Sequence, residues 1–177
     1  MFDKNYRLHG IHAQKARELV AFFDREGKGQ FFKAAKDVYA NAPLVGYLYN
    51  RRAPLDHTKS EETNEELDYS IMSDQVLSVS EDLLFHYVLI MLLDSAYEPD
   101  EDKRIDKAFR FVGKVPDDEE RFNEYVRGGI DVLHEKLIEG GGEPTDYVNR
   151  LYDFLEDIQD RYNSEVDMDA LMKLCVK

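Results

Sequence analysis

Apolar residues recur every three or four positions along most of the chain, which is the spacing of amphipathic helices. The first such stripe spans residues 11–23. A second begins near residue 31 and meets Pro43, which lacks a backbone donor and therefore predicts a kink or a restart of the helix. The restarted piece, residues 44–52, should end before Pro54 because the residue preceding a proline is pushed out of the helical region.

The second half of the chain gives four further helical segments. Residues 83–93 are apolar almost all round and predict a central buried helix. Acidic residues around Pro99 and after Pro116 favour helix starts, with the second of these helices ending at Gly140. A last long helix begins near Pro144. The residues that we expect this last helix to bury are Val148, Leu151, Tyr152, Leu155, Ile158 and Tyr162.

The pattern predicts an all-α fold in one domain covering residues 1–177, a bundle of six to seven helices with room for one short strand or hairpin. Strict alternation of apolar and polar residues is not convincing in any segment, and residues 69–79 are the best place for a strand. Leu171, Met172 and Leu174 predict a short terminal helix. The polar residues 56–64 predict a long mobile loop within an acidic stretch, residues 56–68.

The charge is strongly negative overall but unevenly distributed. Lys and Arg total 23 and Asp and Glu total 37, a formal net charge of −14. Residues 1–55 hold ten of the bases against five acids, whereas residues 56–177 hold 13 bases against 32 acids. The average disfavours a surface that coats nucleic acid uniformly, and it leaves the N-terminal third as the basic part of the protein.

The single cysteine, Cys175, excludes an intrachain disulfide and a cysteine zinc cluster, so we expect a reducing, cytoplasmic setting. The N-terminal residues lack an apolar core of the kind found in signal peptides. The longest apolar stretch, residues 83–93, is shorter than the roughly 20 residues that cross a bilayer, so we expect no membrane association.

Metal and catalytic chemistry find little support in the motifs. His9 and His12 have the spacing of one helical turn, but no third ligand is identifiable, and we expect neither a metal nor another cofactor. His86 lies in the most apolar helix. We interpret it as a hydrogen-bonded core histidine and not as part of a functional site. A recognisable nucleophile motif is missing, so we name no catalytic residue and favour a non-enzymatic role.

Adjacent arginines beside two tyrosines form the first segment with a functional interpretation. The sequence Gly-Tyr-Leu-Tyr-Asn-Arg-Arg occupies residues 46–52. Arginine's planar fork binds phosphate or carboxylate groups through two parallel hydrogen bonds, whereas stabilisation by the helix dipole is the structural alternative. With two lysines from the same basic third, the candidate partner-binding residues are Arg51, Arg52, Tyr47, Tyr49, Lys33 and Lys36.

Paired glycines inside a strong helical pattern form the second segment. Gly128 and Gly129 each cost about 1 kcal/mol relative to alanine in a helix interior, so a compensating gain is expected. Close approach of a neighbouring helix is the commonest gain, and a kink is the other. We therefore interpret this pair first as a helix-packing device.

Both segments resemble the small Dnd system-associated proteins encoded beside bacterial DNA phosphorothioation genes. The first block of the resemblance comprises KDVY at residues 36–39 and GYLYNRRAPL at residues 46–55. The second comprises FNEY at residues 122–125 and GGI at residues 128–130. The acidic residues 60–66 have no counterpart in it. The resemblance implies an accessory role in a DNA-modification or phage-defence operon and assigns no catalytic residue.

Three classes of function follow. The first is an accessory, non-catalytic interaction protein, with a protein partner as the main expectation and nucleic acid as the other, contacted through the basic N-terminal face. The second is an acidic DNA mimic or regulatory protein whose carboxylates copy phosphate spacing. The third, a metal-dependent enzyme, has the least support because it lacks a motif. The sequence gives no signal for a particular oligomeric state.

Overall fold

The computed structural model describes residues 1–61 and 63–162. Its elements follow the chain in the order β1 (Tyr6–His9), α1 (Gly10–Leu19), α2 (Ala35–Leu48), β2 (Asp68–Ile71), α3 (Ser73–Leu77), α4 (Ser80–Leu93), α5 (Glu101–Ile105), the π-helical turn η1 (Asp106–Arg110), α6 (Pro116–Leu137) and α7 (Pro144–Tyr162). The terminal helix expected near Leu171 and the lone Cys175 lie outside the described residues.

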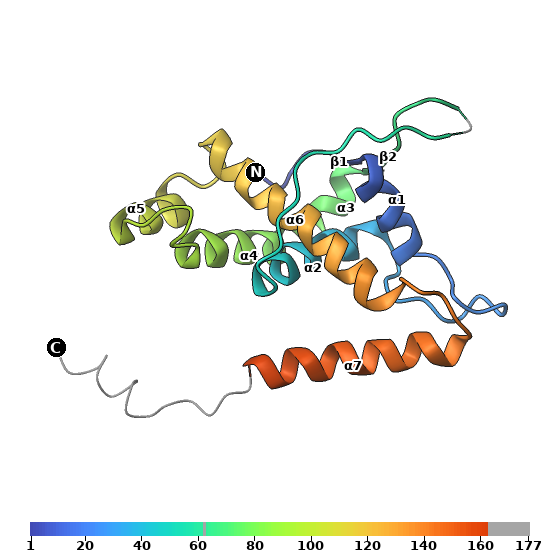
Figure 1. The fold of residues 1–177 in the computed structure, drawn as a ribbon. Helices are drawn as coiled ribbons and strands as arrows, with labels where there is room; N and C mark the ends of the chain where they lie inside the picture. Colours follow the sequence, from blue (N-terminus) through green and yellow to red (C-terminus); the bar gives the residue numbers. More distant parts are fainter. Residues whose placement is uncertain (62, 163–177) are drawn as a thin grey trace.

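The prediction of a mainly helical single domain with room for a short strand is confirmed (Figure 1). β1 and β2 form a two-stranded antiparallel sheet in which Tyr6 pairs with Ile71 and His9 with Asp68. β2 overlaps the segment where a strand was expected, but β1 was missed. Four residues with one buried side chain, Leu8, are too short a pattern to reveal a strand.

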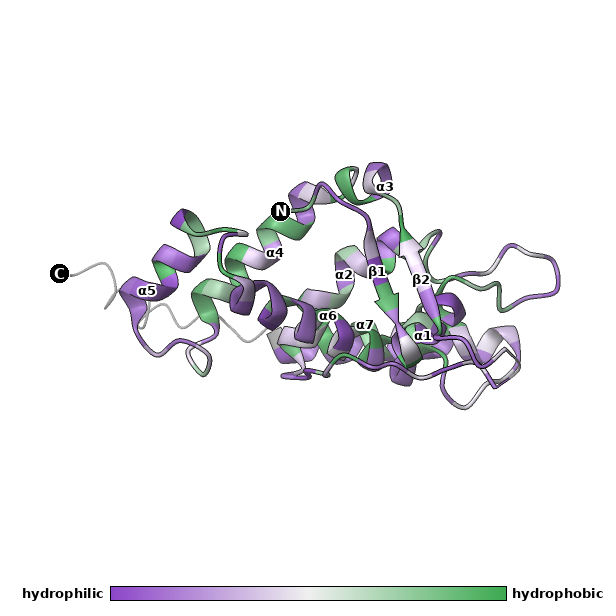
Figure 2. Cartoon of the chain, turned by 90° about the horizontal axis from the view of Figure 1, so that it is seen from above, coloured by the Kyte–Doolittle hydropathy of each residue, from purple (hydrophilic) through white to green (hydrophobic). Residues whose placement is uncertain are grey.

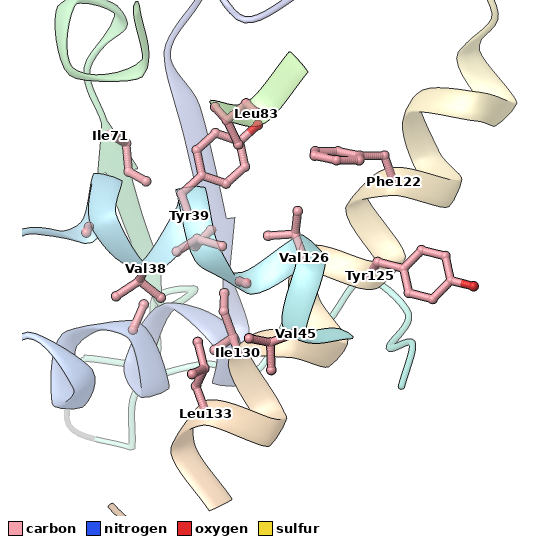
Figure 3. Close-up of a cluster of buried hydrophobic side chains, with 14 of the residues drawn as sticks. Val38, Tyr39, Val45, Ile71, Leu83, Phe122, Tyr125, Val126, Ile130 and Leu133 are labelled. Carbon is pink, nitrogen blue, oxygen red and sulfur yellow. The ribbon is translucent and has the colours of Figure 1, made fainter. Parts of the chain in front are cut away.

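The crossing of α2 over α6 forms the centre of the molecule (Figure 3). A Cβ atom at Gly129 would lie well inside 3.0 Å of the Ala42 carbonyl oxygen, and one at Gly46 would meet the Tyr125 carbonyl. Gly128 lies in the same way against the Arg51 carbonyl. The backbones of the two helices therefore approach as closely as glycine permits, and large apolar side chains from both fill the surrounding space. They include Val38, Val45, Val126, Ile130 and Leu133.

The predicted restart at Pro43 is wrong, because α2 continues through the proline to Leu48. A proline inside a helix costs about 3 kcal/mol. Burial of Pro43 and of Ala42 and Val45 on either side offsets this cost, since this stretch packs on α6. Tertiary packing thus overrides the local penalty.

The prediction that residues 83–93 form the central buried helix is also wrong. α4 lies at the edge of the molecule, and its buried side chains are Leu83, Tyr87, Ile90 and Met91. Leu84 and Phe85 on its other side are exposed. The central position belongs to α6, which is buried along most of its length.

α7 runs along the lower edge of the view in Figure 1 and contacts α6, with further contacts to Tyr49 and Phe23. Its buried residue is Phe154, with Tyr147 and Ile158 half-buried. The expected burial of Val148, Leu151, Tyr152 and Leu155 is wrong, since all four are exposed. The apolar arc of α7 is wider than its contact with the body, so only one edge of the arc is covered. None of the described helices has the length and apolar character needed to cross a membrane.

Candidate functional site

The C-terminal end of α2 turns sharply and presents the two adjacent arginines. The Asn50 amide donates to the Tyr47 carbonyl at 2.9 Å, and the Arg51 amide donates to the Gly46 carbonyl at 2.8 Å. Asn50 has a φ of 48°, the left-handed conformation that asparagine tolerates and that closes helices in this way. Arg51 and Arg52 therefore lie just beyond the helix, which had been expected to extend to residue 52.

The segment after this turn is fixed to α6. The Ala53 amide donates to the Glu124 carbonyl at 3.0 Å, and the buried Arg127 donates from Nε to the Ala53 carbonyl at 2.8 Å. The Arg51 carbonyl rests on Gly128. We call Tyr47, Asn50, Arg51, Arg52 and the facing Tyr125 the arginine corner.

The two arginines of the corner differ in how far they are engaged. The Arg51 side chain is exposed and forms no ion pair with any residue that the structure describes. Arg52 is partly held, with its Nη1 3.5 Å from Glu124 Oε2 and its guanidinium carbon 6.0 Å from the centre of the Tyr125 ring. A weak contact of this length contributes little to stability, so both guanidinium groups are accessible to a partner.

A groove of about 300 Å³ opens beside the arginines. Its residues come from the end of α2, the end of α4 with the loop that follows, and α6, and they are Tyr47, Leu48, Asn50, Leu93, Asp94, Ser95, Ala96 and Tyr125. The Tyr47 and Tyr125 rings meet edge to face at 5.5 Å. The groove is therefore lined by aromatic and aliphatic side chains together with the polar residues Asn50, Asp94 and Ser95.

A buried charge network holds the wall that Tyr125 forms. Asp94 is 5 % exposed and accepts hydrogen bonds from Arg121 Nε and from the Tyr125 hydroxyl, both at 2.8 Å. Burial, reinforced by the hydrogen bond to Asp94, raises the pKa of Tyr125 far above its ordinary value. Tyr125 therefore remains a protonated donor. Arg121 also lies 5.1 Å from the centre of the Tyr97 ring.

A second buried carboxylate connects α6 to η1 and to the loop before α5. Asp118, which is fully buried, accepts from the Tyr97 hydroxyl at 2.7 Å and from Lys107 Nζ at 2.6 Å. These residues were not singled out from the sequence. Two features of the sequence could have indicated the network around Asp94. One is the aspartate directly after the apolar run of α4, and the other is the four-residue spacing that places Arg121 and Tyr125 on one face of α6.

Tyr49, one of the predicted partner-binding residues, points away from the corner. Its hydroxyl donates to Asp157 Oδ2 of α7 at 2.6 Å, and its ring stacks on Phe154 at 6.1 Å. The Arg161 guanidinium lies 4.6 Å from the ring centre. Tyr49 thus fixes α7 to the end of α2.

Lys33 and Lys36 lie at the opposite end of α2 from the arginines. Lys33 is exposed, and Lys36 donates from Nζ to the Ser78 hydroxyl at 3.0 Å. A helix of 14 residues is roughly 20 Å long, so these lysines cannot share one small contact with Arg51 and Arg52. The six predicted residues therefore divide into three places.

Several bases of the N-terminal third are paired with acids from the rest of the chain. Lys15 Nζ lies 2.6 Å from Asp131 Oδ1, and Arg7 Nη1 lies 3.7 Å from Asp68 Oδ2. Arg17 donates to the Asp68 carbonyl. The charge asymmetry of the sequence is thus partly cancelled by folding, and Arg51 is one of the bases that remain exposed.

The histidines are used in structural contacts. His9 Nδ1 lies 3.0 Å from Glu66 Oε1, whereas the buried His12 points to Asp131 with 3.5 Å between Nε2 and Oδ1. His86 Nδ1 donates to the Ala40 carbonyl at 2.9 Å, as its core interpretation requires. Among the described residues, no group of three or more His, Cys, Asp or Glu could hold a metal ion.

The acidic stretch after the corner begins with a structural carboxylate. Asp56 accepts from the Ile11 amide at 2.6 Å and from the Thr58 amide at 3.0 Å. These hydrogen bonds, led by the one from Ile11, lower the pKa of Asp56. Asp56 thereby joins the arginine segment to the first turn of α1. Lys59 and Glu66 pair as an isolated antiparallel bridge further along.

Comparison with known proteins gave no match to a family model, to a curated protein or to a solved structure. The resemblance to the Dnd system-associated proteins therefore stays a prediction that rests on its two blocks. The structure adds one fact about those blocks, which are separated by some 70 residues of sequence. Ala53 bonds Glu124, Tyr47 touches Tyr125 and Gly46 packs on Gly129, so the blocks lie against each other.

Proposed function

We propose that this protein is a non-catalytic interaction protein that binds a partner protein through the arginine corner. The observation that carries the proposal is that the corner brings together two sequence blocks distant in the chain, with exposed arginines from the first block beside the buried Tyr125 of the second. The first block supplies the two guanidinium groups and the second supplies the tyrosine behind them. On the strength of the resemblance, the partner belongs to a bacterial DNA-modification or phage-defence system, and the complex forms in the cytoplasm.

The chemistry of the corner fits an acidic partner surface. Arg51 has no ion pair among the described residues, so a carboxylate of the partner gains a two-pronged contact without displacing one. An apolar side chain of the partner fits the adjacent groove, which Tyr47, Leu48 and Leu93 help to line. Tyr and Arg are the residue types that most often dominate the binding energy of protein interfaces.

The polar groups at the corner support binding rather than catalysis. Asp94 is engaged by Arg121 and Tyr125, and Glu124 lies within 3.5 Å of both Arg121 and Arg52. The groove is lined without a histidine, and the raised pKa of Tyr125 keeps its hydroxyl protonated, so it neither gives up nor takes up a proton near neutral pH. A binding role requires only the exposed cations and the aromatic walls.

Capture of partners from native cells tests the proposal. The variant Arg51→Gln/Arg52→Gln removes both charges and should abolish capture of the partner, while the melting temperature moves little because neither side chain is buried. Added salt should weaken the wild-type interaction. Capture is read by quantitative mass spectrometry of nuclease-treated eluates, so that a protein partner is distinguished from nucleic acid.

The matched control is Lys59→Gln/Lys103→Gln, which also removes two exposed positive charges but leaves the corner intact. It should capture the same proteins as the wild type. An unchanged set of partners for the arginine variant would remove the corner from consideration. A capture that disappears on nuclease treatment would instead assign the arginines to nucleic acid.

A further inference from the structure

The outer face of α7 exposes a continuous apolar stripe. Val148, Leu151, Tyr152 and Leu155 occupy positions i, i+3, i+4 and i+7, so they line one side of the helix. Tyr152 is 66 % exposed, Val148 57 % and Leu155 55 %. This is the spacing with which helices contact other helices, and the described part of the chain leaves it uncovered.

The basic side chains of α7 are turned to the body of the molecule. Arg150 donates to the carbonyls of Ile138 and Gly141, and Arg161 lies over the Tyr49 ring and donates to Asp157 of α7, which also faces the body. Asp153, Glu156 and Asp160 are exposed and lie along one flank of the apolar stripe. The outer surface of α7 is therefore apolar with an acidic border.

Several contacts fix the rotation of α7, so this surface is presented in one orientation. Tyr147 stacks on Phe23 with ring centres 5.1 Å apart, and Phe154 is 7 % exposed. The Tyr49 hydroxyl bonds Asp157 at the other end of the helix. A preformed face loses little conformational freedom when it binds a partner.

We propose that this outer face of α7 is a docking site for a basic amphipathic helix of a partner protein. The apolar stripe would pack against the apolar side of that helix, and lysines or arginines beside it would face Asp153, Glu156 and Asp160. Charge complementarity selects this occupant. In an antiparallel pairing of two copies about a two-fold axis, the two acidic flanks would lie on the same side and repel.

This inference deepens the proposed function, on which it rests, by adding a second contact surface of opposite charge to the arginine corner. Figure 2 shows the chain coloured by hydropathy, from a side on which α7 lies behind α6. The two surfaces predict different partner segments, since the corner fits acidic groups and α7 fits basic ones. They can therefore be tested separately.

The test uses the full chain and a synthetic helical peptide as the probe. The peptide carries leucines at i, i+3, i+4 and i+7 with lysines along one flank, and the control peptide has glutamate at each lysine position. Binding is followed by fluorescence anisotropy at low salt. We expect the lysine peptide to bind and the glutamate peptide to bind at least about tenfold more weakly, because of repulsion from the acidic border.

Two sets of variants locate the binding. Tyr152→Ser/Leu155→Ser should weaken binding of the lysine peptide at least about tenfold, as the loss of two buried apolar contacts requires. Asp153→Asn/Glu156→Gln/Asp160→Asn keeps the stripe and should remove most of the salt dependence. Phe85→Ser on α4, a site of similar exposure at 62 %, is the matched control and should leave the affinity unchanged. Circular dichroism melts verify that each variant is folded.

Three results would overturn the docking site. The first is equal binding of the two peptides or no binding of either, and the second is an affinity that Tyr152→Ser/Leu155→Ser leaves intact. The third is a dimer, measured by light scattering, that this variant dissociates, which would make a second copy the occupant. The Arg51→Gln/Arg52→Gln variant should keep the peptide affinity, so loss of the corner and loss of the α7 site are distinguishable.

Discussion

Gly129 is the residue on which the packing of α2 against α6 depends most directly. A methyl group there would collide with the Ala42 carbonyl oxygen, which belongs to rigid helix backbone. Gly129→Ala should therefore destabilise the fold by at least about 2 kcal/mol, since overpacking moves the backbone. Without that contact the same change would stabilise a helix interior by about 1 kcal/mol. Urea unfolding followed by circular dichroism measures the sign.

Gly27→Asn is the control for this prediction. Gly27 has a φ of 66° with no atom within 4 Å of a Cβ position, and asparagine tolerates that conformation. The free energy of unfolding of the Gly27→Asn variant should stay close to that of the wild type. A stabilised Gly129→Ala variant would show that the two helices are further apart than the structure places them.

His86 gives a pH-dependent prediction. Burial lowers the pKa of His86 and outweighs the opposing effect of the Ala40 carbonyl that it contacts. The folded state therefore binds the proton less readily than the unfolded state. The contribution of neutral His86 to the free energy of unfolding is therefore complete above about pH 6.5. It decreases as the pH falls from there through the lowered pKa of His86. NMR titration of the imidazole should give a pKa below 6.5, and a value above it would contradict the buried contact.

Single residues differed in how much the sequence could say about them. The cost of two glycines in a helix pointed to a close backbone approach at Gly128 and Gly129, which is where α6 meets α2 and the arginine segment. The direction of a side chain at a helix end is not encoded locally. Tyr47 and Tyr49 are two residues apart, yet one lines the groove and the other bonds α7.

Among the elements, η1 and the loop before α5 are attached to α6 through one buried carboxylate, Asp118. Asp118→Asn removes the charge that Lys107 Nζ contacts at 2.6 Å and weakens the hydrogen bond from Tyr97. Breaking a buried ion pair leaves the other charge uncompensated, so we expect a loss of about 3 kcal/mol in the free energy of unfolding. Chemical denaturation measures it.

Asp117→Asn, at the neighbouring exposed position in the same helical turn, should cost less than about 1 kcal/mol through the helix dipole alone. Equal losses for the two variants would mean that the dipole, and not the contact with Lys107 and Tyr97, explains Asp118.

The elements that sequence predicted best are those with one clear apolar stripe, and α6 is the example. The position of α4 was predicted wrongly because a helix that is apolar on all sides does not indicate which side is covered. α4 lies at the edge of the molecule, and Leu84 and Phe85 are exposed. In α7 the apolar arc was recognised, but the edge of it that contacts the body depends on partners from α2 and α6. Packing on α6 likewise outweighed the local cost of Pro43 within α2.

At the scale of the whole molecule, folding changes the meaning of the charge distribution. The sequence showed a basic third and an acidic remainder, and it could not show which bases pair with which acids. Lys15 and Arg7 are paired across the chain, whereas Arg51 is exposed beside the aromatic groove. The corner therefore offers two adjacent exposed arginines, while Lys4, Arg25 and Lys33 are exposed bases of the same third outside it.

The central claim is that the arginine corner is the surface that contacts the partner. Hydrogen exchange measured on the complex purified from native cells, and compared with the isolated chain, tests it most directly. Residues 46–55 and 120–127 should exchange more slowly in the complex, because the partner covers the end of α2 and the facing part of α6. Unchanged exchange in both segments, with protection appearing elsewhere on the molecule, would contradict the claim.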